Sequence, residues 1–326
     1  MYPIKFKPIL KQHIWGGQTL LDIKRGQGLR ADKSKCYGES WDVSGLDNNI
    51  SVARNGFLKG NNLREIIEIY MGEMVGEAVF ERYGLDFPLL LKTLDCCHRV
   101  SVQVHPDDDI AAERHGTCGK TEMWYITSAK EGAIVYIGFK NPNITREEYI
   151  EAVAQGRVAD LLQSISVKKG DVFLLKSGTV HSIAGGVSLI EIQQPVDLTY
   201  RIFDWNRTDA DGKPRELHTA LAVDAIDFGS NVESCKIDYS LDDSGIAKLV
   251  SCDYFAANLL AVSGTMRRDY CSLDSFVLYS CTEGSATIAT EGGEETIAAG
   301  EVILIPAEMN EVAINGNATI VEYYIE

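Results

Sequence analysis

"KKGDVFLLKSGTVHSI" (168–183) decides the fold, because a related stretch returns near the end of the chain as "AAGEVILIPAEMNEVAI" (298–314). Both stretches run from a glycine and an acid through a hydrophobic strand to a turn. When their glycines are aligned, His181 of the first falls on Glu311 of the second. The chain is therefore expected to contain two related β modules, of which the second has lost the histidine.

The remaining pattern also favours strands. Short hydrophobic segments, such as 132–139 and 276–281, are separated by Gly, Asn or Asp, which is typical of a sandwich or barrel. Helical periodicity predicts helices over about 62–84 and 145–165, and the second opens on a capping box.

The predicted fold is mainly β, with two jelly-roll modules and a few helices inserted in or flanking the first. The first domain is expected over 1–235 and the second over 236–326, with the boundary in the polar stretch 228–245.

Composition excludes several classes of partner. The chain of 326 residues has a formal net charge of −16, which argues against nucleic acid or an anionic membrane as a partner. No apolar run approaches the ~20 residues of a membrane span, and the N-terminus lacks a signal-peptide pattern. The eight cysteines have no CxxC spacing and are expected to be reduced thiols. We therefore expect a cytoplasmic protein, and a monomer or weak homodimer.

A second stretch, "SVQVHPDDD" (101–109), carries candidate chemistry. If it begins as a strand, Gln103 and His105 point to the same face, away from the buried valines. From these residues alone, a metal site and an ordinary surface histidine are equally good interpretations. The three aspartates that follow Pro106 are expected to cap a helical turn. The histidines at 13, 98, 115 and 218 have no comparable partner in the sequence.

The pattern G-x5-K-x-G-x2-H within 168–183 resembles the second signature of the cupin superfamily, with Lys176 where proline is usual. In cupins this histidine binds a metal together with residues of an earlier hairpin. The resemblance implies that Gln103, His105 and Glu122 join His181. Such a set of N and O ligands suits a catalytic Zn²⁺ better than a structural one.

Further strings resemble the type I phosphomannose isomerases, in their short bacterial form. They are "FKPILKQHIWGG" (6–17), "GESWDVSG" (38–45), "FPLLLKTLD" (87–95), "QVHPDD" (103–108), "GKTEMWYI" (119–126) and "QQPVDLTYRIFDWNR" (193–207). The resemblance covers most of 1–224. It implies a zinc-dependent aldose–ketose isomerase that interconverts mannose 6-phosphate and fructose 6-phosphate through an enediolate, for mannose metabolism or the supply of GDP-mannose precursors.

The resemblance also assigns residues. The implied ligands of one Zn²⁺ per chain are Gln103, His105, Glu122 and His181. The residues implied in catalysis are Arg201, which stabilises negative charge, and Lys120 and Asp197, either of which could move the carbon proton. For the substrate phosphate the candidates are Lys92, Ser101 and Arg207. The less favoured alternative for Lys92 is a strand-end lysine with a solvated head, and the tryptophans at 15, 41 and 124 are expected to pack.

Two competing functions stay open at this point. One is a cupin dioxygenase using iron or manganese, although those enzymes usually have three histidine ligands. The other is a sugar-phosphate sensor without catalysis, since a fold alone does not fix function. A sensor would be expected to have a damaged site, whereas every implied ligand and Arg201 are present.

Overall fold

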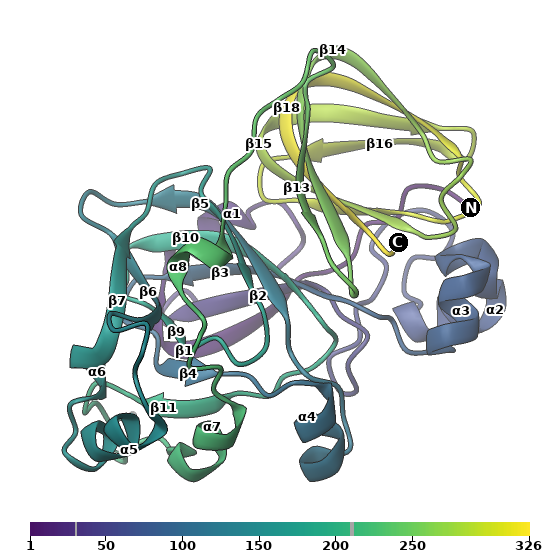
Figure 1. Ribbon diagram of the computed structural model, residues 1–326. Helices are drawn as coiled ribbons and strands as arrows, with labels where there is room; N and C mark the ends of the chain where they lie inside the picture. The colour runs from purple at the N-terminus through teal and green to yellow at the C-terminus, as the bar shows by residue number, and fades with distance from the viewer. Residues whose placement is uncertain (30, 209–211) are drawn as a thin grey trace.

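The computed structural model describes residues 1–29, 31–208 and 212–326. Its strands form three sheets in these ranges, and neighbouring strands within each sheet pair antiparallel. Two sheets belong to the N-terminal part of the chain, and the third forms the C-terminal module, coloured from green to yellow in Figure 1. The prediction of a mainly β, two-module cupin fold is confirmed.

The seven-stranded sheet has the spatial order β1 (Ile9–Gly17), β2 (Tyr37–Val43), β3 (Leu90–Cys96), β10 (Val187–Gln193), β5 (Glu122–Ala129), β8 (Val172–Leu175) and β12 (Lys236–Ile237). The five-stranded sheet has the order β11 (Tyr200–Phe203), β4 (Val102–Val104), β9 (His181–Ile183), β6 (Ile134–Phe139) and β7 (Leu162–Ser166). The third sheet has the order β13 (Ile246–Ser251), β14 (Ala256–Asp269), β18 (Glu311–Tyr324), β15 (Val277–Thr290) and β16 (Gly293–Ala298), and β17 (Val302–Ile305) pairs with β15.

The predicted division between residues 235 and 236 stays a prediction. The short strand β12 begins at 236 and still pairs with β8 of the seven-stranded sheet, whereas the third sheet begins with β13.

The helices lie outside the sheets, as expected. They are α1 (Thr19–Ile23), α2 (Leu63–Val75), α3 (Glu77–Tyr83), α4 (Asp108–His115), α5 (Arg146–Ala154), α6 (Val158–Leu161), α7 (Thr219–Ala225) and α8 (Val232–Cys235). The helix predicted over 62–84 is present as α2 and α3, divided at Gly76, whose φ of 98° interrupts the helical path. Asp107 caps α4 by accepting a hydrogen bond from the Ile110 N–H, as the sequence predicts.

The helix predicted over 145–165 is wrong in its second half. The capping box of Thr145 and Glu148 does start α5, but α5 ends at Ala154 and α6 adds one turn. Gly156, with φ of 67°, breaks the helix between them. Residues 162–166 instead form β7, because they pair with β6 at the edge of the five-stranded sheet. Pairing with a distant strand therefore overrides the local helical pattern.

The two modules share a hydrophobic core. Ile190 and Ile192 of β10 and Met123 of β5 pack in one cluster with Leu278 and Tyr323 of the C-terminal module. The first residues of the chain extend this contact through a bridge between Ile4 and Leu304, and Figure 1 shows the N-terminus beside the C-terminal module. The C-terminal module therefore packs on one face of the seven-stranded sheet. The opposite face borders the space between the two N-terminal sheets.

A buried ion pair ties α1 to this sheet and to the second module. Lys24 Nζ lies 2.6 Å from Asp42 Oδ2 and donates to the Gly300 carbonyl at 2.8 Å, while the side chains of Lys24 and Asp42 are only 1% and 3% exposed. Thr93 and Ser40 donate to the same carboxylate, each at 2.6 Å. Every group of this cluster has a partner, so the loss of one charge leaves the other uncompensated.

We expect Asp42→Ala to destabilise the protein by about 3–5 kcal/mol, because it leaves the Lys24 ammonium buried without its carboxylate. Urea unfolding of the parent and variant measures the difference. Asp22→Ala is the control, because Asp22 pairs with Arg25 on the surface, where both side chains are more than half exposed, and little change is expected. A loss for Asp42→Ala as small as that of the control would contradict the account.

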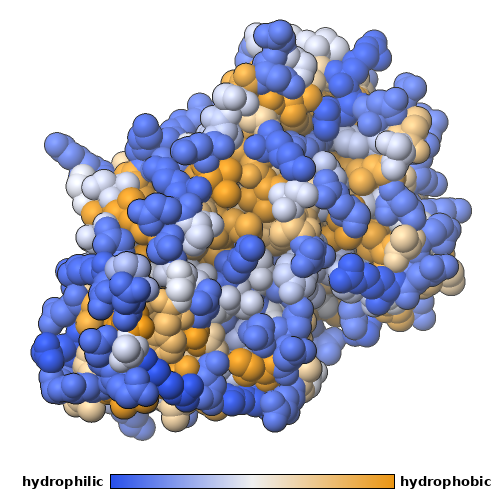
Figure 2. Space-filling view, viewed as in Figure 1, coloured by the Kyte–Doolittle hydropathy of each residue, from blue (hydrophilic) through white to orange (hydrophobic). Residues whose placement is uncertain are grey.

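In the described ranges, no helix is long and apolar enough to cross a membrane. The face seen in Figure 2 has small groups of hydrophobic residues set among hydrophilic ones. All eight cysteines are free thiols, in agreement with the expectation from their spacing.

Candidate active site

The candidate site lies between the two N-terminal sheets, where strand alternation places polar residues. On β10, Ile190 and Ile192 face the core shared with the second module, so Glu191 between them faces the opposite side. On β5, Met123 faces the shared core and Trp124 the space between the sheets, where its Nε1 donates to Glu191 at 2.9 Å. A cavity of about 300 Å³ opens on this inner side.

Most of the predicted site residues meet at this cavity. Seven of the ten line it, namely Lys92, Ser101, Gln103, Lys120, His181, Asp197 and Arg201. Two others, His105 and Glu122, are buried beside it and belong to a cluster with His181. Arg207 is not among the described lining residues.

Three side chains come together as a candidate metal cluster. His105, Glu122 and His181 each offer a nitrogen or oxygen atom, and these atoms all lie within 4.8 Å of one another. The Nε2 atoms of His105 and His181 lie 3.6 Å and 3.4 Å from the two carboxylate oxygens of Glu122. Gln103, whose strand pairs with that of His181, donates from its amide to His181 Nε2 at 3.1 Å. The four residues predicted from the sequence are therefore neighbours in space.

Contacts behind the cluster set the form of both imidazoles. Nδ1 of His105 lies 2.8 Å from the Leu198 carbonyl, and Nδ1 of His181 lies 2.9 Å from the Thr179 carbonyl. A carbonyl only accepts, so each Nδ1–H donates and each Nε2 keeps its lone pair toward the cluster. Burial lowers the pKa of His181 to about 4 and that of His105 well below its usual value, which keeps both rings neutral.

The cluster fits a divalent cation. Both oxygens of Glu122 are buried, and Oε1 has no hydrogen bond among the described residues, while Oε2 lies 2.6 Å from the Lys120 ammonium. Buried carboxylate oxygens without such partners are costly unless another group satisfies them. Two neutral imidazoles, one carboxylate and one amide, with no thiolate, suit a metal site that keeps a position for water or substrate.

Two buried lysines stand beside the cluster, and both contact Glu191. Lys120 Nζ lies 2.6 Å from Glu122 Oε2 and 3.5 Å from Glu191 Oε1. Lys92 Nζ lies 3.3 Å from Glu191 Oε1 and 3.9 Å from Glu39 Oε2. Lys92 is 2% exposed, so the interpretation of a strand-end lysine with a solvated head is wrong. Its charge is instead balanced by two carboxylates inside the site.

Arg201 reaches the cavity from β11, where it pairs with Gln103 of the neighbouring strand. Its Nη1 donates to the Glu216 carbonyl at 2.9 Å, while its Nε is buried without a hydrogen bond among the described residues. Burial lowers the pKa of Arg201, and the nearby positive charge of Arg215 adds to this effect. The group still stays protonated at neutral pH, so it offers donors and charge but no base.

The candidates for phosphate binding differ in whether they reach the cavity. Ser101 is buried and donates to Gln103 Oε1 at 3.4 Å, at the cavity wall. The guanidinium of Arg207 is instead bound to Asp204, with Nε 2.9 Å and Nη2 2.6 Å from Oδ1. Arg215, which contacts the same carboxylate, lines the cavity. Of the two arginines on this carboxylate, Arg215 is therefore the one that lines the cavity, and the substrate contact predicted for Arg207 stays a prediction.

Sequence reasoning also missed three residues of the opposite wall. Glu191 is an acid within a largely hydrophobic strand, which is the same signal that singled out Lys92, whereas the strand of Glu39 also contains Ser40 and Asp42 and gives no such signal. His13, for which the sequence offered no partner comparable to that of His105, also lines the cavity. Its ring stacks on Trp15 at a centroid distance of 4.6 Å, and its Nε2 lies 3.5 Å from Glu39 Oε1. Lys92 and His13 outweigh the effect of burial and hold the pKa of Glu39 well below its usual value.

The tryptophans pack as expected, since Trp15, Trp41 and Trp124 are all at most 3% exposed. Trp15 and Trp124 also line the cavity.

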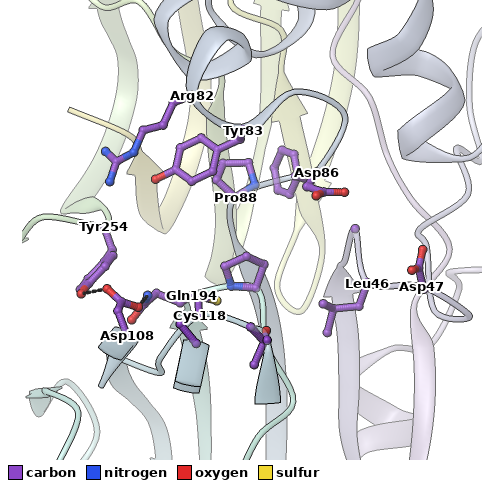
Figure 3. Close-up of a pocket in the computed structure, with 16 residues that line it drawn as sticks. Leu46, Asp47, Arg82, Tyr83, Asp86, Pro88, Asp108, Cys118, Gln194 and Tyr254 are labelled. Carbon is purple, nitrogen blue, oxygen red and sulfur yellow. Dashed lines mark hydrogen bonds between the residues drawn. The ribbon is translucent and has the colours of Figure 1, made fainter. Parts of the chain in front are cut away.

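A larger groove of about 780 Å³ lies elsewhere, between α3, the loop at 45–47 and the C-terminal module (Figure 3). Across it, the Tyr254 hydroxyl donates to Asp108 at 2.7 Å, and Gln194 donates to the same carboxylate at 2.9 Å. Its described lining includes no histidine and none of the ten predicted site residues. The residues that line the smaller cavity therefore identify it as the candidate active site, although the groove has the larger volume.

Comparison with known proteins agrees with this geometry. The family description "Phosphomannose isomerase type I, catalytic domain" matches residues 4–136, and "Mannose-6-phosphate isomerase, cupin domain" matches residues 245–325. A mannose-6-phosphate isomerase of Bacillus subtilis (strain 168) is 34% identical over 318 residues, which are 97% of this chain and 96% of that protein. The chain belongs to the type I phosphomannose isomerases.

Other members of this family also match this chain over nearly its full length. A mannose-6-phosphate isomerase of Streptococcus mutans is 32% identical over 98% of this chain and 97% of its own. The crystal structure of a mannose 6-phosphate isomerase from Bacillus subtilis covers both chains fully, with a TM-score of 0.87 and 33% identity. The resemblance seen in the sequence is therefore confirmed, and the chain is an aldose–ketose isomerase.

Proposed function

We propose that this isomerase interconverts mannose 6-phosphate and fructose 6-phosphate through an enediolate, with one Zn²⁺ held by Gln103, His105, Glu122 and His181. The observation that carries the proposal is the joint occurrence of this ligand set, a buried lysine and an arginine at one cavity. The full-length similarity to mannose-6-phosphate isomerases supports the choice of substrate.

The reaction moves a proton between neighbouring carbons while negative charge builds on oxygen. Lys120, buried beside the ligand set, and Asp197, exposed at the cavity rim, are both proposed to hold or move the carbon proton. Arg201 donates hydrogen bonds to the oxygen on which charge develops, since it cannot give up its own proton at neutral pH. A Zn²⁺ bound at the cluster supplies a further positive charge that stabilises this oxygen.

Other residues of the cavity orient the sugar. Lys92 lines the cavity beside Glu39 and Glu191, and Ser101 lines it beside Gln103, so the cavity wall offers both donors and acceptors. Such a wall suits the hydroxyl groups of a sugar, which donate and accept hydrogen bonds. We propose that Lys92 and Ser101 contact these hydroxyl groups.

The proposal is tested by incubating the purified, zinc-loaded protein with mannose 6-phosphate and measuring fructose 6-phosphate. Glucose 6-phosphate, which differs in the configuration of one hydroxyl, is the matched control substrate. Conversion of mannose 6-phosphate alone is expected. A folded protein that converts glucose 6-phosphate and leaves mannose 6-phosphate unchanged would contradict the proposed substrate.

The dioxygenase alternative receives no support from the comparisons, because the relatives that match over nearly the full chain are mannose-6-phosphate isomerases. The expected partner remains a small-molecule sugar phosphate. The expected oligomeric state remains a monomer or a weak homodimer. A cytoplasmic location likewise remains an expectation.

A further inference from the structure

Arg215 reaches the cavity with a fixed guanidinium group. Its Nε lies 2.8 Å from Asp204 Oδ2 and its Nη2 lies 2.6 Å from Asp204 Oδ1, so the two groups meet as a fork. Asp204 is 5% exposed. Of the five N–H donors of an arginine, this fork occupies two, and three are left for another acceptor. Because Arg215 lines the cavity, that acceptor is expected to come from a bound molecule.

Several contacts fix the position of the Asp204 carboxylate and of the turn that follows it. Arg207, which is not among the described residues that line the cavity, binds the same carboxylate through Nε and Nη2. The next two residues, Trp205 and Asn206, have φ values of 56° and 54°, an uncommon conformation for residues with a side chain. The Trp205 indole donates to the Val100 carbonyl at 2.7 Å, which holds this turn in place. Strain of this kind persists only where the surrounding contacts impose it, and it is frequent at ligand sites.

The balance of charge differs between the two ends of the cavity. Lys92 already faces two carboxylates, those of Glu39 and Glu191. At the other end, Arg201 feels the repulsion of Arg215, and the described ion pairs join Arg215 and Arg207 to the single carboxylate of Asp204. A dianion is therefore attracted to the arginine end and repelled by the carboxylates around Lys92.

We propose that Arg215 binds the phosphate group of the substrate and that Asp204 is the residue that positions it. The proposal rests on the proposed function, in which the substrate is a sugar phosphate. It replaces Arg207, the arginine expected from the sequence, by its neighbour on the same carboxylate. Arg207 then acts behind Asp204 and has no contact with the substrate.

The first experiment compares the parent with Arg215→Gln by steady-state kinetics with mannose 6-phosphate, and by calorimetric titration with inorganic phosphate. We expect KM and the Kd of phosphate to rise together, by about 10- to 100-fold, because one charged hydrogen-bonding group is lost. We expect kcat to stay within about threefold, because the reacting carbons are not touched. An unchanged KM and Kd, or a loss confined to kcat, would overturn the assignment.

Three further variants sharpen the result. Arg114→Gln removes the same charge from an ion pair with Asp224, outside the cavity, and is expected to leave KM unchanged. Arg215→Lys keeps the charge but loses the fork, so an intermediate KM is expected if the variant melts at the parent's temperature. Arg207→Gln should raise KM less than Arg215→Gln does. An equal or larger effect would return the phosphate contact to Arg207 and overturn the proposal.

The titration separates this inference from the proposed function. If the parent protein does not convert mannose 6-phosphate, the proposed substrate is rejected. Loss of phosphate binding in Arg215→Gln would then still support the anion site, because that measurement needs no turnover. Phosphate binding that is equal in the parent and the variant would reject the site whatever the substrate is.

Discussion

Replacing His181 with alanine is expected to remove the bound zinc and to lower kcat by about 10³-fold or more. His181 lies at the start of β9, faces Glu122 at 3.4 Å and holds its Nε2 lone pair toward the cluster. Without it, only one imidazole remains beside the amide of Gln103 and the carboxylate of Glu122, so the affinity for zinc is expected to fall sharply. The positive charge that stabilises the developing oxygen anion is worth several kcal/mol, and about 1.4 kcal/mol corresponds to a factor of ten in rate. Metal content by emission spectroscopy and kcat are measured on the same preparation.

His115→Ala is the matched control for this prediction. His115 bonds to the Tyr200 hydroxyl at 2.7 Å and is outside the described lining of the cavity. We expect it to keep both zinc and turnover. A His181→Ala protein that retains one zinc per chain with the parent's affinity would show that the cluster is not the metal site.

Replacing Arg201 with methionine is expected to lower kcat by about 10²- to 10³-fold while zinc remains bound. Arg201 neighbours the ligand set through its strand pairing with Gln103, but its guanidinium offers donors and has no lone pair for a cation. The loss expected is that of a donor aimed at charge in the transition state. The Arg201 side chain is half-buried, so methionine keeps most of its packing. Methionine loses the hydrogen bond to the Glu216 carbonyl.

Two measurements decide the role of Arg201. Zinc content separates a loss of chemistry from a loss of metal, and KM separates it from a loss of substrate binding. Arg201→Lys is expected to recover little, since a lysine cannot reproduce the planar arrangement of donors. An Arg201→Met enzyme with the parent's kcat would remove Arg201 from the mechanism.

The sequence predicted those features that strand alternation and repeated spacing encode. Gln103 lies on β4 and His105 directly follows that strand, so the two-residue spacing correctly predicted that both reach the cluster. The repeat between 168–183 and 298–314 identifies two modules. Glu122 required the family resemblance, since nothing local connects it to His181. Its place in the cluster depends on the pairing of β5 with β10 and of β4 with β9, which joins segments about 70 to 80 residues apart.

The features that were missed depend on contacts of the same long-range kind. Glu39 approaches His13 and Lys92 only because β2 lies between β1 and β3. Arg207 and Arg215 are eight residues apart and share Asp204, so spacing could not tell which of them reaches the cavity. The helix predicted over 145–165 failed at β7, where pairing with β6 decides the conformation. The local sequence pattern therefore predicted helices and strands better than it predicted which segments contact one another in the fold.

The measurement that tests the central claim most directly is conversion of mannose 6-phosphate to fructose 6-phosphate before chelation, after chelation, and after zinc is added back. We expect full activity, then loss of activity from a protein that remains folded, then recovery with one zinc per chain. Activity that survives complete removal of the metal, verified by emission spectroscopy, would contradict the role given to His105, Glu122 and His181.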